Sequence, residues 1–393
     1  MKSKLAIVSV LAFASTELLA VDPQSIQTES GFDITPLLST GLKYDNNIAS
    51  TSSNETDSWI LSLVPSIRAV LDDGVSKTEL SAAAFNGSYF DSSSDNFTDV
   101  LLGALFDTSL SEQGKINLKA DLVWGHEDRG TGITEGLNTN QDHPTRFNTQ
   151  TASGYYEYGS TQAPARVRLG TKYYNKDYMN QREVTQYRDY DSLLGGINFY
   201  YDTRSGTAAV LQSSVEDISY DFTDPEAPRD SRDTHVKVGA EWQITAITSG
   251  DAKIGYQNKK FDDSSREDFS GLAWTINANW SPLTYTNFNL GTGRRAKDPL
   301  QDGDYVKETT FDLGWTHNWT ESVQTQLRFN RMEEDYVGVS RKDEGDSYTA
   351  SVKYAFRRFI DITFFSTVTD KTSSVPGIEF DRTITGLSFD FSL

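Results

Sequence analysis

The sequence predicts an all-β protein, a transmembrane antiparallel up-and-down β-barrel of about 18 strands, with 16 as the alternative count. Three observations predict it. Apolar and polar residues alternate along many segments, which is the pattern of a strand with two different surroundings. Short turns alternate with long loops, as at the two ends of an outer-membrane barrel. Aromatic residues gather near the ends of the alternating segments, where interfacial girdles lie.

The alternating segments are long and one-sided. From Trp59 to Leu71 every second residue is apolar, and the same pattern recurs in 236–244, 272–280, 311–315 and 348–356. The segments run to about a dozen residues, which exceeds the usual soluble strand and suffices to cross a bilayer at a tilt. A large soluble β-helix or sandwich is the alternative that would also alternate. A closed barrel is favoured because it satisfies every backbone hydrogen bond inside hydrocarbon.

Eight short turns and nine longer loops separate the predicted strands. The turns contain the Gly, Pro and Asp residues that suit sharp reversal. They are Leu71–Gly74, Glu112–Gly114, Gln162–Pro164, Arg204–Gly206, Thr248–Asp251, Ser281–Leu283, Trp319–Glu321 and Arg357–Arg358. The predicted girdle residues are Tyr44, Trp59, Trp124, Trp242, Trp280, Trp319 and Tyr354.

The N-terminus has the form of a secretory signal peptide. Lys2 and Lys4 precede a short apolar run that ends in small residues. Residues 1–20 are therefore predicted to be a signal peptide, with cleavage after Ala14 or Ala20. Residues 21–31 form a short periplasmic segment and 32–393 form the barrel, which places the protein in a bacterial outer membrane.

Composition excludes several function classes. The 393 residues include no cysteine, so thiol chemistry and cysteine-based metal sites are impossible. A formal charge of −20 argues against nucleic-acid binding, because the phosphate backbone would be repelled. The apolar segments are too short for membrane-spanning helices.

The chain ends in the strand-like stretch "GLSFDFSL", in which apolar residues occupy alternate positions. This final strand is predicted to pair with the first, near Ile34 to Tyr44, and so remove the free edges of the sheet. It also resembles the C-terminal signal read by the outer-membrane assembly machinery, although the last residue is Leu rather than Phe or Trp. The residues predicted for closure and assembly are Leu387, Phe389, Phe391 and Leu393.

An eighteen-stranded barrel encloses a lumen too wide for its own side chains to fill, so transport is the default function. The strand positions predicted to face the lumen hold more Lys and Arg than Asp and Glu, and rings of Arg and Lys select anions. The alternative is that these charges only keep a wet lumen hydrated. The predicted pore-lining cations are Lys43, Arg68, Lys119, Arg166, Arg168, Lys172, Lys237, Lys253, Arg328, Lys353 and Arg357.

No catalytic motif supports an enzyme. The chain has four histidines, and neither G-x-S-x-G, H-E-x-x-H nor a P-loop occurs. The best catalytic alternative pairs His126 with Asp128 in "GHED", but a lone loop histidine is usually a surface residue. The prediction is a protein without enzymatic activity, catalytic residues, cofactor or bound metal.

Three segments resemble a known family. The stretches "FDITPLLSTGLKYDNNI" (32–48), "WSPLTYTNFNLGTGR" (280–294) and "WTESVQTQLRFNR" (319–331) are similar to the outer-membrane β-barrel family of exopolysaccharide and capsule operons, described as β-barrel porin type 2. The resemblance covers nearly the whole mature chain and rests on strand patterns rather than chemical signatures. It implies an outer-membrane component of polysaccharide secretion and supplies no catalytic residues.

The leading hypothesis is therefore a channel for export of an exo- or capsular polysaccharide, with an anionic polymer as one option. The first alternative is a general or small-solute diffusion porin with an infolded constricting loop, for which the longest loop, His126–Phe147, is the best candidate. The second is a structural or adhesive barrel. Expected partners are the polymer, outer-membrane lipid and lipopolysaccharide, the assembly machinery and periplasmic export components, but no nucleic acid.

Overall fold

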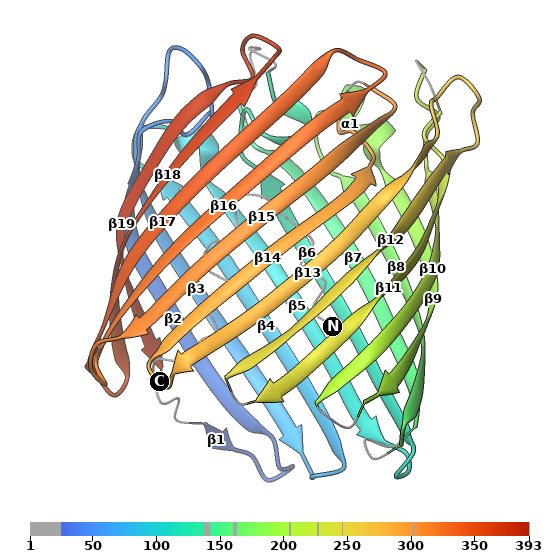
Figure 1. The fold of residues 1–393 in the computed structure, drawn as a ribbon. Helices are drawn as coiled ribbons and strands as arrows, with labels where there is room; N and C mark the ends of the chain where they lie inside the picture. Colours follow the sequence, from blue (N-terminus) through green and yellow to red (C-terminus); the bar gives the residue numbers. More distant parts are fainter. Residues whose placement is uncertain are drawn as a thin grey trace.

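The computed structural model is a closed barrel of eighteen antiparallel strands with one short strand outside it (Figure 1). It describes residues 25–136, 142–159, 163–203, 206–225, 228–245, 247–301 and 303–392. Consecutive strands are hydrogen-bonded neighbours, and the last pairs with the first barrel strand. This confirms the predicted fold class and the count of eighteen; the predicted signal peptide, residues 1–20, lies outside the described residues.

The barrel strands are 12 to 17 residues long. They are β2 (Asp33–Asp45), β3 (Ser58–Asp72), β4 (Ser76–Tyr89), β5 (Phe97–Ser109), β6 (Gly114–Glu127), β7 (Thr145–Tyr158), β8 (Ala165–Tyr178), β9 (Tyr190–Asp202), β10 (Thr207–Tyr220), β11 (Ser231–Thr245), β12 (Thr248–Phe261), β13 (Phe269–Leu283), β14 (Thr286–Lys297), β15 (Tyr305–Asn318), β16 (Val323–Val337), β17 (Arg341–Arg357), β18 (Ile360–Ser373) and β19 (Phe380–Ser392). The outer strand is β1 (Ile26–Gln27), and the short helical turns are η2 (Ser93–Asp95), η3 (Gly132–Thr134), α1 (Arg182–Thr185) and η4 (Gln186–Arg188).

The two ends of the barrel differ in the length of their connections. Short turns join the strands at one end, which is the periplasmic end of an outer-membrane barrel, and mostly longer loops join them at the other. The β16–β17 connection, residues 338–340, is a short turn at the loop end. Two predicted turns were misplaced, because β12 already begins at Thr248 and β13 continues to Leu283. Register shifts near Gln243 and Trp280 keep these hairpins paired beyond the predicted reversal.

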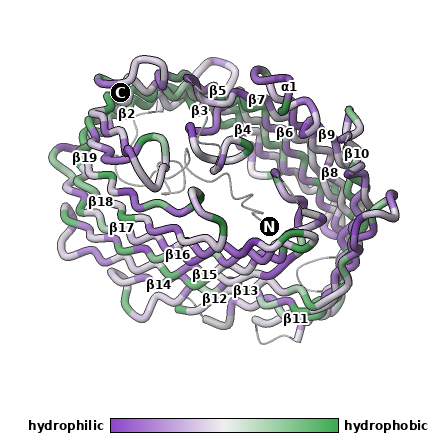
Figure 2. Tube along the Cα trace, turned by 90° about the horizontal axis from the view of Figure 1, so that it is seen from above, coloured by the Kyte–Doolittle hydropathy of each residue, from purple (hydrophilic) through white to green (hydrophobic). Residues whose placement is uncertain are grey.

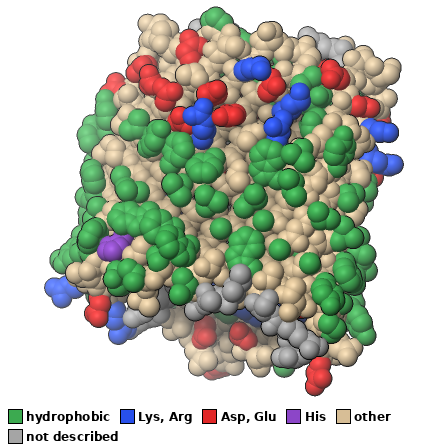
Figure 3. Space-filling view, in the orientation of Figure 1, with side chains coloured by type: hydrophobic (Ala, Val, Ile, Leu, Met, Phe, Trp, Pro, Cys, Tyr) green, Lys and Arg blue, Asp and Glu red, His purple; other side chains and the backbone are tan. Residues whose placement is uncertain are grey.

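The outer wall is apolar over its middle and charged toward the loop end (Figure 3). Side chains two residues apart share a face, and Leu61, Leu63 and Ile67 of β3 are all more than two-fifths exposed. Toward the loop end, Arg331 of β16 pairs with Glu333 and Glu344 on this same outer face. Among the described residues, no helix is long and apolar enough to span a membrane.

Aromatic side chains mark both margins of the apolar band. At the loop end the rings of Tyr44 and Trp59 lie 5.4 Å apart. At the turn end Trp280 stacks on Phe288 at 5.2 Å, and Trp319 is exposed. These positions suit interfacial girdles, which anchor a barrel at the depth where hydrocarbon gives way to headgroups.

The seam joins the two ends of the sheet. β19 pairs with β2 from Ile384 opposite Asp45 to Ser392 opposite Leu37, and Leu387 is exposed on the outer wall. The pairing matches the predicted strand partners, while Leu393 lies outside the described residues. Closure depends on this row of backbone hydrogen bonds, because the outer strand β1 pairs only with Asp33 and Ile34 at the start of β2.

We expect deletion of residues 389–393 to prevent assembly, because it removes two outward-facing aromatic residues and part of the seam ladder. The measurement is heat-modifiable migration of the barrel in outer-membrane fractions. The control is Ile26→Ser in β1, which lies outside the barrel and should leave migration unchanged. Normal migration of the truncated chain would contradict the role of the seam.

Candidate functional site

The lumen wall carries ten of the eleven predicted lining cations. They occupy strand positions of opposite parity to the exposed apolar residues, as with Arg68 beside Ile67 and Lys237 beside Val236 and Val238. Arg357 differs, because a register shift precedes it and its guanidinium lies 5.5 Å from the ring of Phe356, an exposed residue of the outer wall. The structure therefore places Arg357 at the β17–β18 turn rather than in the lumen.

Most lining cations are already paired with carboxylates on the same strand or a neighbouring one. Six form ion pairs, in the combinations Arg68–Glu79, Lys119–Asp121, Arg166–Glu157, Arg168–Glu157, Lys253–Glu241 and Lys353–Asp361. By contrast, no carboxylate of the described residues lies within ion-pair distance of Lys43, Lys172 or Lys237. The wall is thus less basic than its cations alone suggest.

The β6–β7 loop folds into the mouth of the barrel. Its first part, residues 128–136, contains η3, where Ile133 packs with Phe147 and Tyr178 on the wall. Gly130 has a φ of +72°, and a Cβ there would lie 1.9 Å from the carbonyl oxygen of Ala49. Glycine therefore allows this loop to press against the β2–β3 loop. Figure 2 shows loops that bend inward over the opening.

The tip of this loop is tied to a distant part of the wall. The Glu135 carboxylate pairs with Arg341 of β17, at 2.5 Å, and with Lys371 of β18. The two cations are 7% and 10% exposed, so the ion pair is shielded from solvent. Burial makes such contacts strong and costly to break from one side.

Gln301, in the β14–β15 loop, joins several loops at the same place. Its side-chain amide donates to the carbonyl oxygens of Ile133, at 3.2 Å, and Glu135, at 2.5 Å. Its side-chain oxygen accepts from Arg341, and its backbone oxygen accepts from Arg229 of the β10–β11 loop at 2.7 Å. β15 lies nine positions from β6 in the strand order, halfway around an eighteen-stranded barrel. The loop therefore reaches across the lumen.

We call Glu135, Gln301, Arg341 and Lys371 the mouth cluster. Sequence reasoning identified the long loop as a candidate constriction but none of these four residues. Glu135 is separated from its three partners by 166 to 236 positions in the chain. Only the closed ring of strands brings them together.

A second cluster holds the base of the loop. Arg382 of β19 pairs with Asp45 of β2 at 2.5 Å and with Asp128 at 3.5 Å. His126 lies between two carboxylates, with Nδ1 2.9 Å from Asp99 and Nε2 3.2 Å from Asp128. Arg382, Asp45, Asp128, His126 and Asp99 form the Asp128 cluster, which ties the loop to the seam.

This arrangement explains the "GHED" motif structurally. Both ring nitrogens of His126 face carboxylates, so neither is open to take a proton from a serine or water nucleophile. The side chain is also 3% exposed. His126 and Asp128 are therefore arranged as an anchor of the loop, not as a catalytic pair.

One group of carboxylates comes close enough to consider a metal. Ligand atoms of Asp177, Asp189 and Asp221 lie within 4.8 Å of one another. Asp189 already accepts hydrogen bonds from the backbone N–H of Tyr178 and from Arg182. Repulsion from Asp177 and Asp189, after burial, raises the pKa of Asp221. Nothing else at this position indicates a bound ion.

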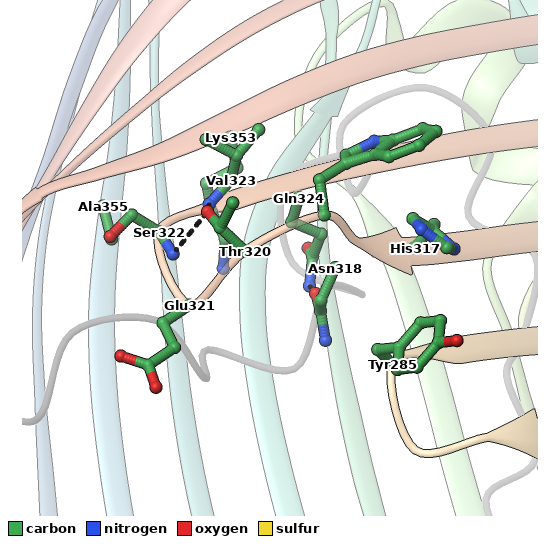
Figure 4. Close-up of a pocket in the computed structure, with 11 residues that line it drawn as sticks. Tyr285, His317, Asn318, Thr320, Glu321, Ser322, Val323, Gln324, Lys353 and Ala355 are labelled. Atoms are coloured by element: carbon green, nitrogen blue, oxygen red, sulfur yellow. Dashed lines mark hydrogen bonds between the residues drawn. The ribbon is translucent and has the colours of Figure 1, made fainter.

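A separate hollow of about 580 Å³ surrounds the β15–β16 turn at the other end of the barrel (Figure 4). Tyr285, His317 and Asn318 lie on one side of it, and Ser322 and Lys353 on the other. Thr320 accepts a hydrogen bond from the backbone of Ser322, which shapes the turn. The hollow belongs to the turn and its girdle residues rather than to the mouth cluster.

A closed eighteen-stranded barrel with an apolar outer band and a polar, charged lumen defines an outer-membrane channel of porin type. A family model described as "Putative beta-barrel porin 2" matches residues 27–392. The chain belongs to this family and resides in the bacterial outer membrane. At the level of the family, its proteins are non-enzymatic channels.

Solved structures of bacterial outer-membrane proteins are also similar. OpdK from Pseudomonas aeruginosa is 11% identical, with 93% of this chain and 99% of that chain covered and a TM-score of 0.49. A BenF-like porin from Pseudomonas fluorescens Pf-5 is 11% identical, with 92% and 99% covered and a TM-score of 0.47. No curated protein sequence matches the chain.

The Asp128 cluster predicts a pH-dependent contribution to stability. Burial alone would raise the pKa of Asp128, but the hydrogen bond with His126 and the charge of Arg382 lower it from 3.8 to about 2. A lowered carboxyl pKa stabilises the folded state above pH 4, and the contribution disappears as the pH falls toward 2. The expected size is about 2 kcal/mol.

The measurement is the free energy of unfolding in urea for the wild type and Asp128→Asn, in vesicles, followed by tryptophan fluorescence. The difference between them should shrink by about 2 kcal/mol between pH 7 and pH 2. The exposed loop substitution Asp91→Asn serves as control and should show little pH-dependent difference. A difference for Asp128→Asn that is constant with pH would contradict the role of the charge.

Proposed function

We propose that the protein is a passive diffusion channel for small polar solutes, narrowed at its outer mouth by the β6–β7 loop. The observation that carries the proposal is the attachment of Glu135 to Arg341 and Lys371, across the lumen from β6. A barrel of this size would otherwise leave a wide aqueous passage. A loop tied to the opposite wall divides that passage and sets an upper limit on solute size.

The lining supports a preference for anions. Lys43, Lys172 and Lys237 face the lumen without a carboxylate within ion-pair distance among the described residues, whereas Lys119, Lys253 and Lys353 are paired with carboxylates. Unpaired positive charges in a narrow pore lower the barrier for anions and raise it for cations. We therefore propose a channel with modest anion selectivity.

Export of an exo- or capsular polysaccharide is the second candidate, and a different observation favours it. Tyr174, Tyr190 and Tyr220 form a chain of rings on the lumen side of β8, β9 and β10, with centroids 5.5 and 5.3 Å apart. Aromatic faces offer sequential weak contacts to sugar rings, and a polymer needs contacts weak enough to leave. In this case the mouth cluster would have to open, and periplasmic export components would deliver the polymer.

We expect Glu135→Gln to raise single-channel conductance in planar bilayers. The substitution removes the carboxylate through which the loop binds Arg341 and Lys371. These two cations keep Asp343 as a partner, so the loop is loosened while the wall stays compensated. The control is Glu55→Gln, an exposed carboxylate of the β2–β3 loop, which should leave conductance unchanged. Equal conductance in all three proteins would contradict a constriction held by Glu135.

Reversal potentials in the same bilayers should show anion preference, and clear cation selectivity would contradict the proposed lining.

A deletion strain separates the two candidates. Slower uptake of small anionic solutes with unchanged secreted polysaccharide is expected for the diffusion channel. Polymer trapped in the periplasm, with normal solute uptake, would instead support export. Complementation with Glu135→Gln provides the matched comparison, since it should restore uptake if the channel itself is responsible.

A further inference from the structure

The periplasmic half of the lumen contains a pair of arginines whose charge is not balanced. Arg166 and Arg168 lie near the start of β8, on the lumen face. Glu157, near the end of β7, is the carboxylate between them, 3.0 Å from Arg166 Nη1 and 2.5 Å from Arg168 Nη2. Two guanidinium groups thus share one carboxylate, and one positive charge remains.

Some ion pairs on the wall lack this excess, such as the one-to-one pair of Lys119 and Asp121 at 2.6 Å. Glu79 resembles Glu157, because it is shared by Arg68 at 2.7 Å and Lys77 at 3.6 Å. Lys253 has the opposite composition, because it lies between Glu241 at 3.0 Å and Asp251 at 3.3 Å. Arg68 and Lys77 are 50% and 40% exposed, so solvent screens their excess charge, whereas the excess at Arg166 and Arg168 is largely shielded.

A tyrosine completes the arrangement. The ring of Tyr200 lies 4.8 Å from the Arg166 guanidinium and 5.2 Å from that of Arg168. Arg168 also lies 4.4 Å from the ring of Tyr155, so aromatic faces fix its orientation. Tyr200 is 1% exposed, and its hydroxyl has no hydrogen-bond partner among the residues that the structure describes. A buried hydroxyl without a partner is costly and is usually explained by a missing ligand or water.

We infer that Arg166, Arg168 and Tyr200 form a binding subsite for a carboxylate group. The carboxylate would accept a hydrogen bond from the Tyr200 hydroxyl and from guanidinium N–H groups that Glu157 does not occupy. The guanidinium fork matches carboxylate geometry, and charge-assisted hydrogen bonds of this kind are the strong ones. The arginine side chains are 19% and 17% exposed, so they remain accessible from the lumen.

The inference rests on the proposed channel function and specifies its solute. Two sources share the chemistry: a small free acid, and a uronic acid unit within a polymer. A one-charge excess suits a single carboxylate that binds briefly and leaves, as passage through a channel requires. Because Glu157 competes for the same N–H groups, it keeps the affinity low.

The test uses purified wild-type barrel and the probes galacturonate, a short oligogalacturonate and galactose, the last being the neutral analogue. Binding is measured by calorimetry in detergent, and block of single-channel current is measured in planar bilayers. Wild type should bind galacturonate but not galactose. Tighter binding of the oligomer per molecule would indicate a polymer as the source, and equal binding would indicate a small acid.

Four variants report on the site. Tyr200→Phe removes only the hydroxyl, and Arg166→Gln removes one charge; each should weaken galacturonate binding about tenfold. Glu157→Gln should tighten it, because both guanidinium groups are then free for the ligand. Lys119→Gln, in the one-to-one pair with Asp121, is the control and should leave affinity unchanged. Heat-modifiable migration verifies that each variant assembles.

The outcomes separate this inference from the proposed function. Conductance without galacturonate binding, or binding that Tyr200→Phe and Glu157→Gln leave unchanged, would overturn the subsite. Weaker binding in Glu157→Gln would also overturn it, because Glu157 would then act as a scaffold rather than a competitor. Binding with the expected variant pattern but no channel conductance would support the subsite and overturn the channel.

Discussion

The inability of hydrocarbon to hydrogen-bond a peptide group is the constraint on which the rest of this structure depends. Each strand must find both neighbours within the protein, so the sheet closes and β19 meets β2. Closure fixes the register, and register assigns alternate side chains to lipid and to water. The apolar outer wall, the charged lumen and the girdles all follow from that single requirement.

Closure also creates a problem that the loops solve. Eighteen strands form a ring too wide to be filled by the side chains of the wall, so selection by solute size requires a loop that folds into the lumen. The β6–β7 loop folds in this way, and buried ion pairs hold it at its base through Asp128 and at its tip through Glu135. Arg341 and Lys371 share two carboxylates, Glu135 of the loop and Asp343 of β17, so the buried charges at this attachment balance.

The sequence could predict the barrel because its signals are local. A period of two, turn residues and aromatic positions are all read within one hairpin, and the few misplaced turns near Thr248 and Leu283 reflect register shifts that no local pattern reveals. The mouth cluster could not be predicted. In the sequence Gln301 is an ordinary polar loop residue, and only the closed barrel brings Glu135 within hydrogen-bond distance of it. The lining cations were predicted from the alternation of side chains along each strand. Their pairing with carboxylates such as Glu157 and Asp361 depends on the register between neighbouring strands, which the sequence does not show.

The position of Arg382 links the narrowing of the mouth to the order of assembly. Arg382 belongs to the last strand, Asp45 to the first and Asp128 to the loop, so the three meet only when the two ends of the chain lie side by side. A partly inserted sheet with an open seam would hold Asp128 through His126 but would lack Arg382. The base of the loop thus reaches its full set of partners only in the completed ring, which ties the final position of the loop to the last step of assembly.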